Sequence, residues 1–158
     1  MSRVNHNDIE GIELCLSWHP ASNGDIPAGA VKAGEDCYVA RAKHEGEWVP
    51  GKLSAGHTSA YVPYGDEEVP YSEYEVLVSS EIGHFGCGYQ WLPAKGNSVP
   101  KGALVSGYDN GAPLYVARAT FEGEVCCGKA QPDLECAYIS WGGKEHKIVD
   151  DYEVLTMN

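Results

Sequence analysis

Residues Trp18 to Lys52 read WHPASNGDIPAGAVKAGEDCYVARAKHEGEWVPGK, and Trp91 to Lys129 repeat them as WLPAKGNSVPKGALVSGYDNGAPLYVARATFEGEVCCGK. Each copy ends on Tyr-Glu-Val-Leu, at Tyr74–Leu77 and Tyr152–Leu155. The second copy carries an extra loop, Asn110–Pro113, in a stretch typical of surface turns. A long internal repeat sets the architecture and doubles every surface site that both copies keep. This doubling favours multivalent binding over catalysis.

The repeat predicts an all-β fold made of two pseudo-symmetric units. The chain has 158 residues, with 19 glycines and 9 prolines that leave little room for a long helix. We expect a first repeat at 12–78, a second at 85–158 and a short linker at 79–84. A unit of about 70 residues buries only a marginal core by itself. The two repeats are therefore expected to share one core.

Short runs with two-residue alternation predict the strands. The expected strands are Ile12–Trp18, Phe85–Trp91, Tyr38–Ala42, Tyr115–Ala119, Tyr74–Val78 and Tyr152–Thr156. Turns are expected at Glu45-Gly46 and Glu122-Gly123. Arg41 and Arg118 lie in the middle of strands between alanines, where an arginine more often bonds a neighbouring carboxylate or carbonyl than a ligand.

Charge and composition exclude several classes of protein. The formal net charge of −12 argues against nucleic-acid binding and against anionic membranes. No stretch has the length of apolar residues that membrane insertion by a helix requires. The first residues show no apolar segment of a signal peptide, so we expect a cytoplasmic protein or one secreted by a non-classical route.

The six cysteines are expected to be reduced and mostly buried, since a structural disulfide would be kept in both copies. Only Cys15 and Cys87 lie near one another in the repeat frame, and they are one position apart. There is no C-x-x-C pair, and the histidines do not cluster at ligand spacing. No metal or other cofactor is therefore expected.

Both copies keep an aspartate and a lysine in equivalent loops. Asp36 and Asp109 come just before the central strand of their repeat. Lys52 and Lys129 each follow a glycine, after the strand that succeeds the central one. The intervening hairpin could bring each aspartate close to the lysine of its own copy. A surface salt bridge of little energetic value is the alternative. Glu47 and Glu124 are also repeated, and their role is left open.

An Asp–Lys pair beside a glycine suits a sugar diol. The carboxylate accepts hydrogen bonds from two hydroxyl groups, and the ammonium donates to their oxygens. The glycine would let a ligand approach the backbone. Glycoside hydrolysis needs two carboxylates at a defined separation, which Asp36 and Glu47 could imitate. A carbohydrate-active enzyme is therefore kept as a rival, with no catalytic residue assigned.

The tandem elements Gly-x-Asp, YVARA, Glu-Gly-Glu…Gly-Lys and Tyr-Glu-Val-Leu resemble the DM-nine repeat family, whose repeats also accompany natterin-like toxins. The likeness covers nearly the whole chain and is strongest to molluscan mannose-binding lectins built of two such repeats. It implies two intertwined repeats, a homodimer, and sugar binding by Asp36 with Lys52 and by Asp109 with Lys129. The implied partners are mannose-containing glycans and microbial surface polysaccharides, in pattern recognition and agglutination during innate immunity.

The two copies depart from the family pattern in different ways. The first has Gly34-Glu35-Asp36 instead of Gly-Tyr-Asp, and the second has Cys127-Gly128-Lys129 instead of Pro-Gly-Lys. The two sugar sites can therefore differ in affinity or in preferred sugar. A protein-interaction module on the same fold is the alternative to a lectin.

Overall fold

The computed structural model describes residues 16–79 and 88–157. Within these ranges the chain is almost entirely β-structure, as the repeat pattern predicts. The first repeat forms β1 (Leu16–Ser22), β2 (Cys37–His44), β3 (Glu47–Ser54), β4 (Ala60–Tyr64), β5 (Glu67–Tyr71) and β6 (Glu73–Ser79). The second forms β7 (Tyr89–Ala94), β8 (Val105–Asp109), β9 (Ala112–Phe121), β10 (Glu124–Gln131), β11 (Cys136–Trp141), β12 (Lys144–Ile148) and β13 (Tyr152–Met157), with a short 3₁₀ turn at Pro132–Leu134.

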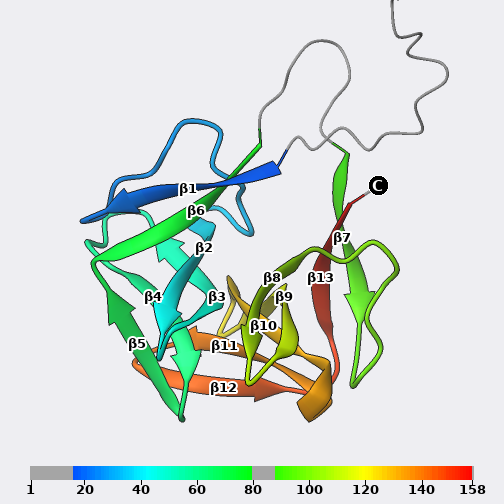
Figure 1. Ribbon diagram of the computed structural model, residues 1–158. Coiled ribbons are helices and arrows are strands. Elements are labelled where there is room, and N and C mark those ends of the chain that lie inside the picture. The colour runs from blue at the N-terminus through cyan, green and yellow to red at the C-terminus, as the bar shows by residue number, and fades with distance from the viewer. Residues whose placement is uncertain (1–15, 80–87, 158) are drawn as a thin grey trace, which may run out of the picture.

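All of these strands belong to one curled sheet with an internal pseudo-twofold symmetry. The order is β1-β6-β2-β3-β4-β5-β12-β11-β10-β9-β13-β7, and β8 pairs with β9 beside this path. The second half of the order repeats the first half in reverse. The halves join where β5 meets β12, at the pair Glu67 and Lys144, and the edge strands β1 and β7 lie on the other side (Figure 1).

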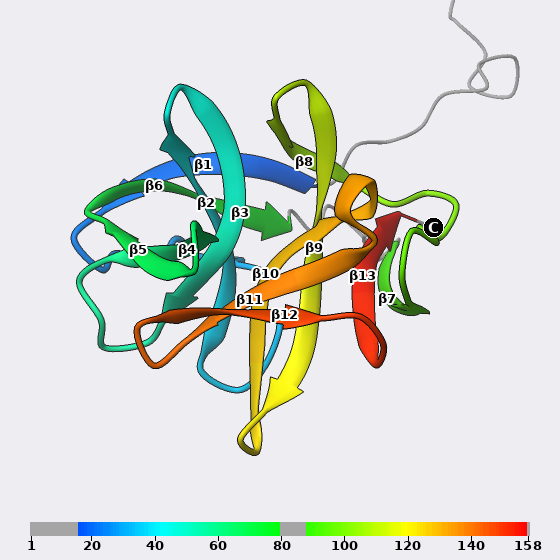
Figure 2. The same cartoon turned by 90° about the horizontal axis from the view of Figure 1, so that it is seen from below.

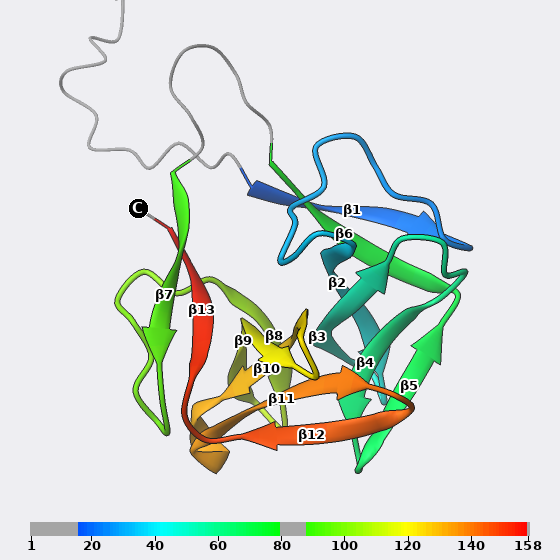
Figure 3. The same ribbon diagram turned by 180° about the vertical axis from the view of Figure 1, so that it is seen from behind.

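The central strands and the closing strands lie where the sequence predicts them, but the first strand of each repeat extends further. β1 continues past Trp18 to Ser22 because β6 offers partners as far as Glu73. Pro20 and Pro93 are tolerated there because both strands are at the edge of the sheet. Figure 3 shows these two edges from behind. The expected strand residues 12–15 and 85–87 and linker residues 80–84 lie outside the described residues.

The predicted hairpin turns connect β2 to β3 and β9 to β10. Glu45 and Gly46 have φ angles of 51° and 85°, and Glu122 and Gly123 have 50° and 80°. Two successive residues with positive φ are typical of the tight hairpin turns that match the twist of the strands. Each turn fixes the register in which the next strand, β3 with Lys52 or β10 with Lys129, pairs with the central strand.

The two repeats share a buried core, as expected from their small size. The central cluster combines residues of both repeats that are at most 6% exposed: Val31, Ala33, Cys37, Val39 and Leu77 from the first, and Val116, Cys127 and Leu155 from the second. Its strand residues belong to β2, β6, β9, β10 and β13, and Figure 2 shows β2 and β3 of the first repeat beside β9 and β10 of the second. A second cluster of first-repeat residues also includes Leu114 of the second repeat.

Arg41 and Arg118 have the structural role that their position predicts. Arg41 binds Glu75 at 2.7 Å and stacks on Trp18 at 4.3 Å, and Arg118 binds Glu153 at 3.0 Å. Each arginine also reaches into the other repeat. Arg41 Nη1 donates to the carbonyl oxygen of Ser106 at 3.1 Å, and Arg118 Nη1 donates to that of Ala33 at 3.1 Å. We call these two bonds the reciprocal clasps, because each repeat holds a loop of the other.

The described residues form no helix with the length and hydrophobicity that a membrane span requires. In the same ranges, no group of three or more His, Cys, Asp or Glu side chains is arranged to hold a metal ion.

Candidate functional site

The first site is a cavity of about 550 Å³ between the two repeats. Asp36 and Lys52 of the first repeat line it together, as the hairpin argument predicts. Glu124 of the second repeat also lines it. Asp36 lies in the loop before β2 and is exposed, and within the described residues its carboxylate has no side-chain hydrogen bond. Both oxygens of Asp36 are therefore open to a ligand.

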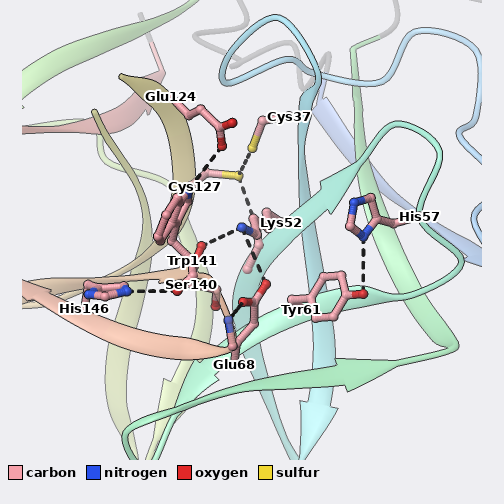
Figure 4. Close-up of polar contacts among 12 residues, drawn as sticks. Cys37, Lys52, His57, Tyr61, Glu68, Glu124, Cys127, Ser140, Trp141 and His146 are labelled. Carbon is pink, nitrogen blue, oxygen red and sulfur yellow. Dashed lines mark hydrogen bonds and ion pairs between the residues drawn. The ribbon is translucent and has the colours of Figure 1, made fainter. Parts of the chain in front are cut away.

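Lys52 is buried in the wall of the first site, with only 8% of the residue exposed. Its Nζ donates to the carbonyl oxygen of Ser140 at 2.6 Å and lies 3.5 Å from Oε1 of Glu68, as Figure 4 shows. A lysine ammonium carries three N–H donors. Two are directed to these partners, so one N–H remains for a ligand in the cavity.

Trp141 of the second repeat positions the carboxylate of Glu124. Its Nε1 donates to Oε2 of Glu124 at 3.1 Å (Figure 4). The indole ring packs against Phe121, with ring centroids 5.2 Å apart. Glu124 is thereby held at the cavity by the second repeat, while Asp36 lines the same cavity from the first.

The second site holds the equivalent residues in a closed form. Asp109, Glu47 and Tyr64 line a cavity of only about 40 Å³. The residues around this small cavity do not include Lys129, whose Nζ lies 4.7 Å from the centre of the Tyr64 ring and 5.3 Å from that of Tyr138. Tyr64 thus covers the ammonium of Lys129, whereas Lys52 lines the open cavity of the first site.

Asp109 also has its carboxylate oxygens engaged by neighbouring side chains. Nε2 of Gln131 donates to Oδ2 at 2.7 Å, and the hydroxyl of Tyr64 donates to Oδ1 at 3.3 Å. Gln131 is only 3% exposed, and its Oε1 has no hydrogen-bond partner among the described residues. At the equivalent position the first repeat has the much shorter Ser54, which lines the open cavity. Gln131 therefore occupies space that Ser54 leaves free.

Burial shifts the charge balance of the second site. Desolvation lowers the pKa of Lys129, an effect that the nearby carboxylates of Glu145 and Asp109 oppose. Desolvation likewise raises the pKa of Glu145, while the ammonium of Lys129 opposes that rise. Oε2 of Glu145 is buried and has no hydrogen-bond partner within the described part of the chain. The charges of Lys129 and Glu145 thus stabilise one another inside the protein.

Three expectations about the sites need correction. Lys52 and Lys129 are not exposed surface charges, since both are buried, and Lys52 pairs with Glu68 and not with Asp36. The glycines before them do not admit a ligand. A Cβ on Gly51 would lie 2.1 Å from the carbonyl oxygen of Tyr61, so this glycine lets β3 pass close to β4.

The third correction concerns the carboxylate pair that would imitate a glycosidase. Glu47 lines the second cavity, with Asp109, and Glu124 lines the first cavity, with Asp36. The glutamates are thus exchanged between the repeats, and Asp36 and Glu47, the two carboxylates that could imitate a glycosidase pair, line different cavities. Repetition of the two glutamates was the available sequence signal, but a repeat does not show across which interface its residues act.

The fold and the two cavities define a tandem-repeat β protein with paired polar sites. The family model of the DM9 repeat matches residues 32–148, and the chain therefore belongs to the DM9 repeat family. This membership confirms the resemblance that the tandem motifs suggest.

Curated relatives and a solved structure share this likeness. Natterin-4 of Thalassophryne nattereri is 38% identical over 74 residues, which are 47% of this chain and 17% of that protein. Natterin-3 of the same species is 32% identical over 78 residues, 49% of this chain and 19% of that protein. The crystal structure of the nematode sperm cell motility protein MFP2B covers 90% of this chain and 44% of its own, with a TM-score of 0.71 at 19% identity. The last likeness shows the fold alone.

Proposed function

We propose that this protein is a lectin that binds mannose-type hexoses, and that the first site is its principal binding site. The observation that carries the proposal is the open cavity that presents Asp36, Lys52 and Glu124 to the same space. Asp36 would accept hydrogen bonds from two adjacent hydroxyl groups, and the remaining N–H of Lys52 would donate to one of their oxygens. Glu124 would accept from a further hydroxyl across the cavity.

The charge of the first site favours a neutral sugar. Glu35, Asp36 and Glu124 line the cavity with one ammonium, that of Lys52. A uronic acid, a sialic acid or a sulfated sugar would bring another negative charge among these carboxylates, and like charges at short range repel. Neutral hexoses with adjacent hydroxyl groups should therefore bind better than anionic glycans of the same size.

The second site would contribute weakly, because Gln131 and Tyr64 engage the carboxylate that a sugar would need. A shallow site that exchanges water hydrogen bonds for sugar hydrogen bonds binds weakly, on the order of tens of μM to mM. Agglutination of microbial cells through such sites needs at least two per particle. A homodimer with one open site in each chain would meet that need and gain avidity.

The test is a glycan array followed by calorimetry with free mannose, using the full chain and its Asp36→Asn and Asp109→Asn variants. We expect binding to neutral mannose-type glycans, with Asp36→Asn weakening it about 10- to 100-fold, because hydrogen bonds to a charged group are lost. Asp109→Asn should leave the affinity within about twofold.

Other outcomes have distinct meanings. A folded protein that binds no glycan would overturn the proposal and favour the protein-interaction module. Turnover of a glycoside would favour the enzyme. Equal losses from Asp36→Asn and Asp109→Asn would retain the lectin but contradict the ranking of the two sites.

A further inference from the structure

Two cysteine side chains meet at the centre of the shared core. Cys37 begins β2 of the first repeat, and Cys127 lies on β10 of the second. Their Sγ atoms are 3.2 Å apart, although the residues are 90 positions apart in the chain (Figure 4). The Cys127 thiol also lies 3.3 Å from the carbonyl oxygen of Gly51, on the first repeat. The contact therefore bridges the two repeats.

The pseudo-symmetry provides an internal comparison for this contact. Leu114 and Pro50 occupy the equivalent positions, just before the YVARA strand and just before Gly-Lys. Both are buried, Leu114 with no exposed surface. Buried apolar residues thus occupy the equivalent positions in the other half of the molecule. The fold does not demand thiols at these positions, so Cys37 and Cys127 call for another explanation.

The two thiols differ in their surroundings. A hydrogen bond from Cys127 lowers the pKa of Cys37, against the effect of burial, and the Lys52 ammonium lowers it further. Burial raises the pKa of Cys127 well above its usual range. Cys37 also lines the cavity of the first site, whereas Cys127 is fully buried. Cys37 therefore has both the ionisation and the solvent route of an attacking thiolate.

We propose that Cys37 and Cys127 form an oxidation-sensitive thiol pair, which a small hydroperoxide entering through the first cavity converts into a disulfide between the two repeats. The sulfur of the Cys37 thiolate attacks one peroxide oxygen, the O–O bond breaks, and hydroxide leaves. The Cys127 thiol then gives up its proton, and its sulfur displaces hydroxide from the Cys37 sulfenic acid. In sum, two thiols and hydrogen peroxide give one disulfide and two waters, and two electrons pass from sulfur to oxygen.

The neighbouring Cys126 is the matched control. It also lines the first cavity, but burial is the main cause that raises its pKa to about 11, so it stays protonated near neutral pH. Successive residues of a strand point to opposite faces of the sheet. The Cys126 side chain accordingly packs in a different buried cluster from Cys127. Oxidation should select Cys37 and leave Cys126 reduced.

A disulfide between residues this far apart would restrict the unfolded chain strongly. The oxidised full-length protein should melt on the order of 5–15 °C higher than the reduced protein. The inference does not depend on sugar binding, because its readouts are the covalent bond and the melting temperature.

The experiment treats the reduced full chain with hydrogen peroxide, blocks the remaining thiols with an alkylating reagent and maps the peptides by mass spectrometry. We expect one cross-linked pair, Cys37 with Cys127, and a melting temperature that returns to its original value on reduction. Cys37→Ala and Cys127→Ala should both abolish the cross-link, and Cys126→Ala should retain it. In Cys127→Ala, dimedone should label the Cys37 sulfenic acid, which has lost its resolving partner.

Three results of this experiment would contradict the proposal. Oxidation of Cys37 to sulfinic acid in the unmodified chain, without the cross-link, would overturn the proposal. So would a Cys37 that stays alkylatable under peroxide, or a disulfide that joins Cys37 to a cysteine other than Cys127. Mapping at the level of peptides separates these cases from oxidation of Cys15 or Cys87.

Discussion

The first and second sites contain the same aspartate and lysine, yet one is open and the other is closed. Asp36 faces a cavity of about 550 Å³, whereas Asp109 faces one of about 40 Å³ and accepts hydrogen bonds from Gln131 and Tyr64. The change from Ser54 to Gln131 adds a side chain that reaches the carboxylate. Preservation of a motif in two repeats therefore does not preserve an accessible site, because residues outside the motif decide its accessibility.

The largest expected difference between the sites concerns stability. Lys52→Met would leave Glu68, whose side chain is 9% exposed, without its cation. Breaking a buried pair on one side should cost about 3 kcal/mol, or roughly 6–12 °C in melting temperature. Lys129→Met is the matched control. Within the described residues Lys129 has no carboxylate at salt-bridge distance, so its loss should cost about 1 kcal/mol. Thermal unfolding of both variants checks the order.

If Lys129→Met destabilised the protein more than Lys52→Met, the carboxylates around Lys129 would need its charge more than their distances from it indicate. Lys52→Met with Glu68→Gln adds a second control. If the pair is the cause, the double change should recover much of the stability, because no buried charge is then left unpaired.

Exchange of the filling residues should move the open cavity from one repeat to the other. Ser54→Gln should place an amide on Asp36 and weaken mannose binding about tenfold, since the charged acceptor is then engaged internally. Gln131→Ser with Tyr64→Ala should expose Asp109 and Lys129. Calorimetry should then count two sugars per chain instead of one.

Circular dichroism on both variants controls for misfolding. An unchanged affinity in Ser54→Gln, in a folded protein, would show that Gln131 does not close the second site by contact with the aspartate.

The smallest effect should come from the aromatic residues that orient the site carboxylates. Trp141→Phe removes the donor to Glu124 and should weaken binding at the first site about fivefold, which corresponds to one hydrogen bond. Tyr64→Phe removes the equivalent donor to Asp109 and should leave mannose affinity unchanged. Titration of both variants with mannose compares them. A loss in Tyr64→Phe as large as that in Trp141→Phe would break the distinction between the sites.

The sequence predicts the features that depend on neighbours within one repeat. YVARA forms the central strand in both copies, Glu45-Gly46 forms the turn, and the hairpin returns Lys52 to the cavity that Asp36 lines. Local alternation and turn chemistry determine all of these features, and such patterns are visible in a single copy.

Features that depend on contact between the repeats could not be predicted. Glu124 reaches the site of Asp36, and the carbonyl oxygen of Ser140 accepts a hydrogen bond from Lys52, because the pseudo-twofold brings each half over the other. A repeat states which positions are equivalent but not which positions touch. Burial of the lysines and closure by Gln131 depend on this packing, and the role of the glutamates stayed open for the same reason.

The reciprocal clasps can form only late during synthesis on the ribosome, because each joins residues that are far apart in the chain. Ser106 follows Arg41 by 65 residues, which takes roughly 3–13 s at about 5–20 residues per second. During that interval the emerging first half also lacks Leu114, which belongs to its own buried cluster. Ala33 precedes Arg118 by 85 residues, so at the same rate it waits roughly 4–17 s for its donor. Both bonds, which are equivalent in the finished molecule, therefore form late, and the nascent chain exposes its core strands until they do.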